Sequence, residues 1–223
     1  MKLIILDFDG PINNQIEAKR EALQKTAEEL SIELTEKNIW EIVNYIDQIY
    51  ETEKIYDYAE IINKSLAKLV SNNSLNLNNE TVDKFATIFS EKMQNIVHLS
   101  RDVEIFIKEA RRKNADLNVC IYSTQIESEI KRLLNISGID RNLFDRIYDR
   151  NYFEEPKPST VNFEKILEDF HVEPREVVMV GDNVAVDLAP AKMLGIKTVL
   201  LNQFVDLTVN DISELKSLTE KEN

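Results

Sequence analysis

Residues 3–10 read Leu-Ile-Ile-Leu-Asp-Phe-Asp-Gly, an apolar run that ends in two aspartates and a glycine. A second apolar run, Val177–Val180, leads in the same way to Gly181-Asp182-Asn183, with Asp187 close behind. Short apolar runs are typical of strands buried on both faces, and carboxylates directly after them are poor core residues and good ligands for a hard cation. The two runs therefore predict buried strands with an acidic site at their ends.

Carboxylates that gather in one place repel one another. Two of them about 4 Å apart repel by roughly 1 kcal/mol in bulk water and by roughly 4 kcal/mol near a protein surface. A site that collects three or four carboxylates therefore needs a compensating positive charge. We expect Mg²⁺ to supply it.

The net charge limits the partners of the chain. Its 223 residues include 27 Lys and Arg against 40 Asp and Glu, which gives a formal net charge of −13. Nucleic acids and anionic membranes attract clusters of Lys and Arg, so we expect neither as a partner. A phosphorylated substrate is also repelled at long range, so an anion site must be built locally from a metal ion, a lysine and backbone amides.

Cysteine content and hydropathy indicate the compartment. Cys120 is the single cysteine and lies in an apolar run, where a small buried thiol is common. No apolar run is long enough for a signal peptide core or a membrane span, so a cytoplasmic location is expected. The length suits one α/β domain, alone or with a smaller inserted domain, and we expect a monomer or a homodimer.

The hydrophobic pattern changes twice along the chain. After a predicted strand at 3–7, apolar residues recur at helical spacing from Gln15 to about Met93. From Asp102 onward, predicted helices alternate with predicted strands, which is typical of a parallel sheet wrapped by helices. The predicted helices here are 102–112, 127–134, 161–170 and 188–194, and the predicted strands are 118–122, 144–148, 177–180 and 198–201.

This order predicts an α/β fold class, a Rossmann-like parallel sheet core wrapped by helices with an inserted α-helical domain. Residues 1–12 and 98–223 are assigned to the core domain, and residues 13–97 to the inserted helical domain. Ligands of an open parallel sheet bind beyond the carboxyl ends of its strands.

Several polar residues are expected to meet at those strand ends. Asp7, Ser123 and Asp182 each follow directly on a predicted strand, so one crevice can collect all three side chains. Lys157 lies between two prolines in the loop after the short strand 144–148 and can reach the same place.

Asp187 has two interpretations. It can cap the helix 188–194, with Pro190 in the first turn and Gly195 as a left-handed cap at the end. It can also stand beside the metal site and orient a water molecule or Lys157. One carboxylate can do both.

The chain resembles the haloacid dehalogenase superfamily of phosphohydrolases. Four motifs of that family have counterparts in the right order: Asp7-Phe8-Asp9-Gly10, Ser123, Lys157, and Gly181-Asp182 with Asp187. The resemblance covers residues 1–12 and about 98–202, and the helical segment between them resembles the family's α-helical type 1 cap. The second aspartate of the first motif argues against the dehalogenase branch, which generally lacks it.

The resemblance and the residue types together imply a magnesium-dependent phosphatase that acts on a small phosphorylated metabolite. Asp7 is the expected nucleophile that forms an aspartyl phosphate, and Asp9 is the expected general acid and base. Lys157 and Ser123 are expected to hold the phosphoryl oxygens. The predicted metal-site residues are Asp7, Asp9 through its backbone carbonyl, Asp182 and Asp187.

Two alternatives stay open. A phosphomutase of the same superfamily, similar to β-phosphoglucomutase, would pass the phosphoryl group to a sugar hydroxyl instead of water. A non-catalytic binding protein would retain the scaffold, although clustered carboxylates cost stability without a metal or a function. Pro11 and Gln125 depart from the residues usual in the family motifs, so an atypical substrate pocket is expected.

Overall fold

A parallel β-sheet lies at the centre of the α/β part of the chain. The computed structural model describes residues 1–13, 15–53, 55, 57–97 and 99–201. Within these residues the sheet has five strands: β1 (Leu3–Leu6), β2 (Asn118–Tyr122), β3 (Arg146–Tyr148), β4 (Val177–Gly181) and β5 (Lys197–Leu200). The segments that form β1 and β4 are almost wholly apolar, and every residue of β1 is buried, as strands covered on both faces require.

The strand order is β3-β2-β1-β4-β5, and all neighbouring strands pair in parallel. From β1 the chain adds β2 and β3 on one side and later adds β4 and β5 on the other side. The winding direction therefore changes between β1 and β4. In open sheets of this type, the carboxyl ends of the strands at that point border the ligand-binding crevice.

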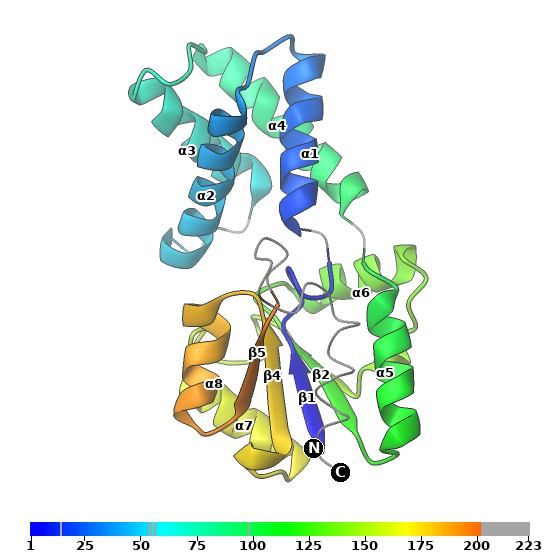
Figure 1. The fold of residues 1–223 in the computed structure, drawn as a ribbon. Coiled ribbons are helices and arrows are strands. Elements are labelled where there is room, and N and C mark those ends of the chain that lie inside the picture. The colour runs from blue at the N-terminus through cyan, green and yellow to red at the C-terminus, as the bar shows by residue number, and fades with distance from the viewer. Residues whose placement is uncertain (14, 54, 56, 98, 202–223) are drawn as a thin grey trace. The chain divides into compact units, whose positions relative to one another are not determined.

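Helices cover both faces of the sheet (Figure 1). They are α5 (Asp102–Lys113), α6 (Glu127–Ile136), α7 (Thr160–Phe170) and α8 (Ala189–Met193). Figure 1 shows α7 and α8 on one side of the sheet and α5 on the other. Phe163 and Ile166 of α7 pack with Ile5, Cys120 and Met179 of the strands in one core. Burial of each large apolar side chain contributes roughly 1.5–3 kcal/mol, so this packing holds the strand ends in register.

The helical unit is built from amphipathic segments with clear start signals. Its helices are α1 (Gln15–Glu29), α2 (Glu36–Glu53), α3 (Tyr58–Ser71) and α4 (Asn79–Ile96). The Asp57 side chain caps α3 by accepting the Glu60 N–H at 2.9 Å, and Asn78 caps α4 by accepting the Thr81 N–H at 2.8 Å. Such caps are worth about 1 kcal/mol each.

Contacts divide the chain into two compact units: Met1–Asn14 with His98–Asn223, and Gln15–Val97. The two segments that lead out of the α/β unit run beside each other. Asn13 pairs with Leu99 in an antiparallel bridge, and the Ser100 N–H donates to the Ile12 carbonyl at 3.0 Å. These contacts fix the end of the loop that follows β1.

The predicted α/β fold with a parallel sheet is confirmed. The strand predicted at 118–122 has those bounds, and the helix predicted at 161–170 begins one residue earlier, at Thr160. Gly195 has a φ of 83°, as expected of a left-handed cap.

The prediction that Asp187 caps a helix is wrong. A π-helical turn, Val184–Leu188, precedes α8, and Asn183 caps this turn by accepting the Ala185 and Val186 N–H groups at 3.0 and 3.1 Å. Asp187 lies inside the turn and is buried, and its carboxylate accepts a hydrogen bond from Lys157 Nζ. The residue that caps this turn is therefore Asn183, four residues before Asp187.

Within the described residues, no helix combines the length and apolarity that crossing a membrane requires.

Candidate active site

Strand β1 brings Asp7 to the carboxyl edge of the sheet. The Asp7 N–H donates to the Val180 carbonyl at 2.8 Å, and the buried carboxylate accepts a hydrogen bond from Lys157 Nζ, also at 2.8 Å. Burial is the largest cause that raises the pKa of Asp7 well above its ordinary value, and repulsion from Asp187 adds to it, while Lys157 opposes both. Asp7 therefore needs more positive charge nearby to stay ionised.

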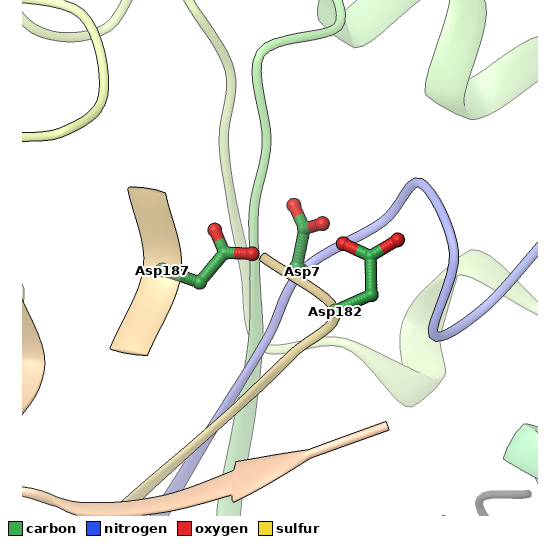
Figure 2. Close-up of side chains that lie close together, drawn as sticks. All are labelled: Asp7, Asp182 and Asp187. Atoms are coloured by element: carbon green, nitrogen blue, oxygen red, sulfur yellow. The ribbon is translucent and has the colours of Figure 1, made fainter. Parts of the chain in front are cut away.

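Three carboxylates converge at this point (Figure 2). One oxygen from each of Asp7, Asp182 and Asp187 lies within 4.8 Å of the other two. Asp7 follows β1, Asp182 follows β4, and Asp187 comes from the π-helical turn. These are hard oxygen donors of the kind that Mg²⁺ prefers. Three negative charges and the single positive charge of Lys157 leave two negative charges, which one divalent cation balances. The donor set thus fits Mg²⁺.

Two glycines allow the loops to approach these carboxylates. Gly10 has a φ of 93°, and a Cβ atom there would overlap the Asp182 carboxylate. At Gly181 a Cβ atom would lie 2.6 Å from Asp187 Oδ2. Any larger residue at either position would push a carboxylate out of the cluster, so the glycines are needed for close approach as well as for backbone conformation.

Lys157 is held by two carboxylates and an aromatic ring. Its Nζ lies 2.8 Å from Asp7 Oδ1 and 2.8 Å from Asp187 Oδ1, and 4.4 Å from the centre of the Tyr122 ring. Burial by itself would lower the pKa of the Lys157 ammonium, but the Asp187 and Asp7 carboxylates outweigh it and raise the pKa above its ordinary value. Lys157 is therefore a fixed cation.

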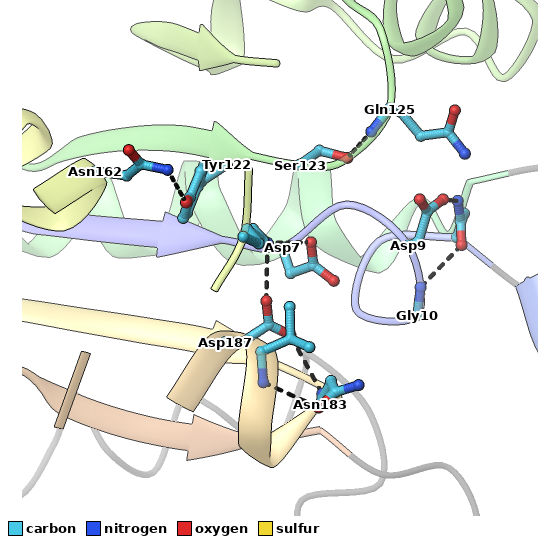
Figure 3. Close-up of polar contacts among 12 residues, drawn as sticks. Asp7, Asp9, Gly10, Tyr122, Ser123, Gln125, Asn162, Asn183 and Asp187 are labelled. Carbon is cyan, nitrogen blue, oxygen red and sulfur yellow. Dashed lines mark hydrogen bonds and ion pairs between the residues drawn. The ribbon is translucent and has the colours of Figure 1, made fainter. Parts of the chain in front are cut away.

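The sequence did not reveal the hydrogen bond that holds the Tyr122 ring next to Lys157; Figure 3 shows this bond between Asn162 and Tyr122. Tyr122 Oη accepts a hydrogen bond from Asn162 Nδ2 at 2.8 Å, and the same amide group donates to the Glu155 carbonyl at 2.8 Å. The available signal was an asparagine in the first turn of an otherwise apolar helix face, next to Phe163. This network fixes the ring on which the ammonium rests.

Ser123 lies at the end of β2, as predicted, and is buried. Its N–H donates to the Tyr148 carbonyl at 2.9 Å, and its Oγ accepts the Gln125 N–H at 3.0 Å (Figure 3). Ser123 and Lys157 border the same small hollow, together with Thr124. The turn thus holds the Ser123 hydroxyl oxygen beside the hollow that Lys157 borders.

Asp9 lies beside the cluster, on the loop after β1. Its Oδ1 accepts a hydrogen bond from Asn13 Nδ2 at 2.7 Å, and Asn13 Oδ1 accepts the Gly10 N–H at 3.0 Å. Asn13 is a residue that the sequence did not single out. The available signal was an asparagine four residues after the second aspartate of the motif.

Asp187 is the most enclosed of the predicted metal-site residues, with 1% of its surface exposed. One carboxylate oxygen binds Lys157, and the other accepts the Asn183 N–H at 3.2 Å. Of its two interpretations, the contact with Lys157 occurs and the helix cap does not.

Comparison with known proteins matches the sequence to a family. The family model described as haloacid dehalogenase-like hydrolase matches residues 4–201. Phosphoglycolate phosphatase of Aquifex aeolicus is 25% identical over 228 residues, which cover 99% of this chain and 97% of that protein. Glyceraldehyde 3-phosphate phosphatase of Pyrococcus furiosus is 28% identical over 94 residues, which cover 37% of this chain and 39% of that protein.

Solved structures agree on the fold. The HAD-hydrolase YfnB of Bacillus subtilis, bound to magnesium, has a TM-score of 0.73 at 16% identity, with 98% of each chain covered. L-2-haloacid dehalogenase of Xanthobacter autotrophicus has a TM-score of 0.63 at 16% identity, with 98% of this chain and 88% of that chain covered. Together with the family model, which spans most of the sequence, these findings give the family: the chain belongs to the haloacid dehalogenase-like hydrolases.

Proposed function

We propose that this haloacid dehalogenase-like hydrolase is a magnesium-dependent phosphatase that hydrolyses a small organic phosphate monoester through an aspartyl phosphate on Asp7. The observation that carries the proposal is the cluster of three carboxylates at the strand ends, two of which are buried and bind Lys157. Such a group costs stability unless a cation and an anionic ligand complete it. Both curated relatives named above are phosphatases, which supports the same reaction class.

In the first half-reaction, an Asp7 carboxylate oxygen attacks phosphorus and the bond from phosphorus to the leaving oxygen breaks. Asp9 gives its proton to that leaving oxygen. In the second half-reaction, Asp9 takes a proton from a water molecule whose oxygen attacks phosphorus. The bond between Asp7 and phosphorus then breaks, inorganic phosphate leaves, and the Asp7 carboxylate is restored.

Positive charge and hydrogen-bond donors hold the phosphoryl group during both steps. Lys157 Nζ faces the Asp7 carboxylate from 2.8 Å, so it is placed to contact phosphoryl oxygens bound to Asp7. Ser123 borders the same hollow as Lys157 and provides a hydroxyl group there. Asp7, Asp182 and the Asp9 carbonyl would hold Mg²⁺, with Asp187 beside them. The bound ion supplies the charge that keeps Asp7 ionised and stabilises the phosphoryl oxygens.

The presence of Asp9 favours the assignment as a phosphatase over the assignment as a dehalogenase. A leaving alkoxide needs a proton, whereas a leaving halide does not, and Asp9 lies two residues from the nucleophile.

We also propose that the helical unit serves as the cap of this family, because it is inserted in the chain directly after the first motif. The small phosphorylated substrate, the cytoplasmic location and the monomeric or homodimeric state stay predictions.

The test measures phosphate release by the purified protein with and without Mg²⁺. Phosphoglycolate, glyceraldehyde 3-phosphate and p-nitrophenyl phosphate serve as esters, and the Asp7→Asn variant serves as the control. We expect Mg²⁺-dependent release that the variant lacks. Isomerisation of hexose phosphates without phosphate release would instead identify a phosphomutase, and Mg²⁺ binding without turnover of any ester would favour a binding protein.

A further inference from the structure

Asn13 is a buried asparagine in the catalytic loop that the reaction above leaves without a role. Only 2% of its surface is exposed. Its amide nitrogen donates to Asp9 Oδ1 at 2.7 Å, and its amide oxygen accepts the Gly10 N–H at 3.0 Å. The Asn13 side chain therefore ties the Asp9 carboxylate to the backbone that follows it.

The contact with Gly10 fixes which end of the amide faces Asp9. A backbone N–H can only donate, so it must meet the amide oxygen of Asn13, and the NH₂ group is left to face the carboxylate. This NH₂ group donates to Oδ1 of Asp9, so the hydrogen bond holds that oxygen and not Oδ2. Asn13 thus fixes one of the two carboxylate oxygens of Asp9.

Asn13 is itself well fixed. It pairs with Leu99 in an antiparallel bridge, and the neighbouring Ile12 carbonyl accepts the Ser100 N–H at 3.0 Å. Gly10, Pro11 and Ile12 carry no side-chain hydrogen-bond donor, so from residue 10 to residue 13 the sequence offers Asn13 as the single donor side chain. Asp9 is only half-buried, and an anchored partner reduces the rotamers it can adopt.

We propose that Asn13 is a positioning residue that holds Asp9 in the orientation needed to protonate the leaving oxygen. The proposal rests on the general acid role of Asp9 in the function given above. A misplaced general acid costs most when the leaving group is a poor one. An alkoxide cannot depart readily without a proton, whereas the phenolate of nitrophenol can. The decrease in kcat/KM caused by replacing Asn13 should therefore depend on the leaving group.

Two variants separate the contacts of Asn13. Asn13→Leu removes both hydrogen bonds at similar size, and Asn13→Asp keeps the acceptor for the Gly10 N–H while removing the donor to Asp9. The measured quantity is kcat/KM, which reports the steps up to departure of the leaving group, with phosphoglycolate and with p-nitrophenyl phosphate. For both variants we expect roughly 10²-fold loss with the alkyl ester and little loss with the aryl ester, since a misplacement of about 1 Å costs that much.

A double-mutant cycle with Asp9→Asn distinguishes positioning from a structural role. If Asn13 acts through Asp9, Asn13→Leu has no further effect on kcat/KM once Asp9 is already Asn. Asn114→Leu is the matched control. Asn114 also makes one hydrogen bond with each end of its amide, at the opposite end of β1. Its amide nitrogen donates to the Met1 carbonyl at 2.7 Å, and its amide oxygen accepts the Asp116 N–H at 3.2 Å. Asn114→Leu should leave the ratio of the two kcat/KM values unchanged.

Equal losses on both esters, or a full further loss in the Asp9→Asn background, would overturn the role of Asn13. Asn13→Leu is used only if circular dichroism shows that it folds. If it does not fold, the kcat/KM values of the near-isosteric Asn13→Asp variant for the two esters provide the test. An active wild-type protein with an unchanged ester ratio in the variants refutes this inference alone. A wild-type protein that hydrolyses neither ester refutes the proposed function and this inference with it.

Discussion

Lys157 of the α/β unit and Lys19 of the helical unit are both buried, but their partners differ. Lys157 binds Asp7 and Asp187, whose side chains are 11% and 2% exposed. Lys19 Nζ lies 2.6 Å from Asp47 Oδ1, and the Asp47 side chain is 47% exposed. Asp47 can thus keep much of its hydration, while the carboxylates at Lys157 cannot. Excess buried negative charge is costly, so the first arrangement indicates a binding site and the second a structural ion pair.

The largest expected effect comes from removing the nucleophile at the Lys157 site. Asp7→Asn should abolish phosphate release, because the amide cannot form an aspartyl phosphate. Its melting temperature without Mg²⁺ should be equal to or above that of the wild type, because one of three repelling carboxylates is gone. A kinetic assay together with a thermal melt checks both parts. Residual turnover near the wild-type rate would contradict the nucleophile assignment.

Removing Lys157 tests the difference between the two lysines directly. Lys157→Met leaves Asp7 and Asp187 buried without their cation, and such a change costs about 3–5 kcal/mol of unfolding free energy. Urea titration without Mg²⁺ measures the loss. A loss below about 1 kcal/mol, which is typical of exposed pairs, would mean that the carboxylates are better hydrated than their burial implies.

Mg²⁺ should stabilise the wild-type protein by binding at the carboxylates of the α/β unit and not at the Lys19 pair of the helical unit. Binding to the folded state at about 100 times the dissociation constant raises the unfolding free energy by about 2.7 kcal/mol. Asp182→Asn removes one oxygen ligand charge and should greatly reduce this gain. Thermal melts over a series of Mg²⁺ concentrations provide the measurement. An equal stabilisation of the wild type and of Asp182→Asn by Mg²⁺ would mean that the ion binds at a site without Asp182.

The smallest effect is expected in the helical unit. Lys19→Met removes a pair whose carboxylate is half exposed, so the unfolding free energy should fall by only about 0–1 kcal/mol. The Mg²⁺-dependent rise in melting temperature should persist in this variant, because the carboxylate cluster is intact. A loss as large as that of Lys157→Met would show that exposure of the partner does not separate the two lysines.

Local patterns were enough to predict most of the fold. Buried strands have continuous apolar runs, and the runs at 3–6, 118–122 and 177–180 became neighbouring strands of the sheet. The helical spacing after Gln15 likewise corresponds to four helices within the described residues of the helical unit. Such patterns are readable because each residue's burial follows from the repeat of its own element.

The candidate site was only partly readable from the sequence. Motif order gave Asp7, Lys157 and Asp182, but Asn13 and Asn162 were missed, since a buried amide has no periodic signature. The capping role of Asp187 was predicted wrongly because residue type and spacing cannot distinguish a cap from an ion-pair partner.

The sequence by itself determined the α/β order, the helical insertion and the residue types at the strand ends, because these depend on local periodicity and on chemistry. The tertiary structure decided which of those residues touch. Lys157 binds Asp7 across 150 residues of chain and Asp187 across 30, and Tyr122 meets Asn162 across 40. Contacts at such separations depend on how the sheet and helices pack. Charge balance and hydrogen bonding at the site therefore follow from the fold.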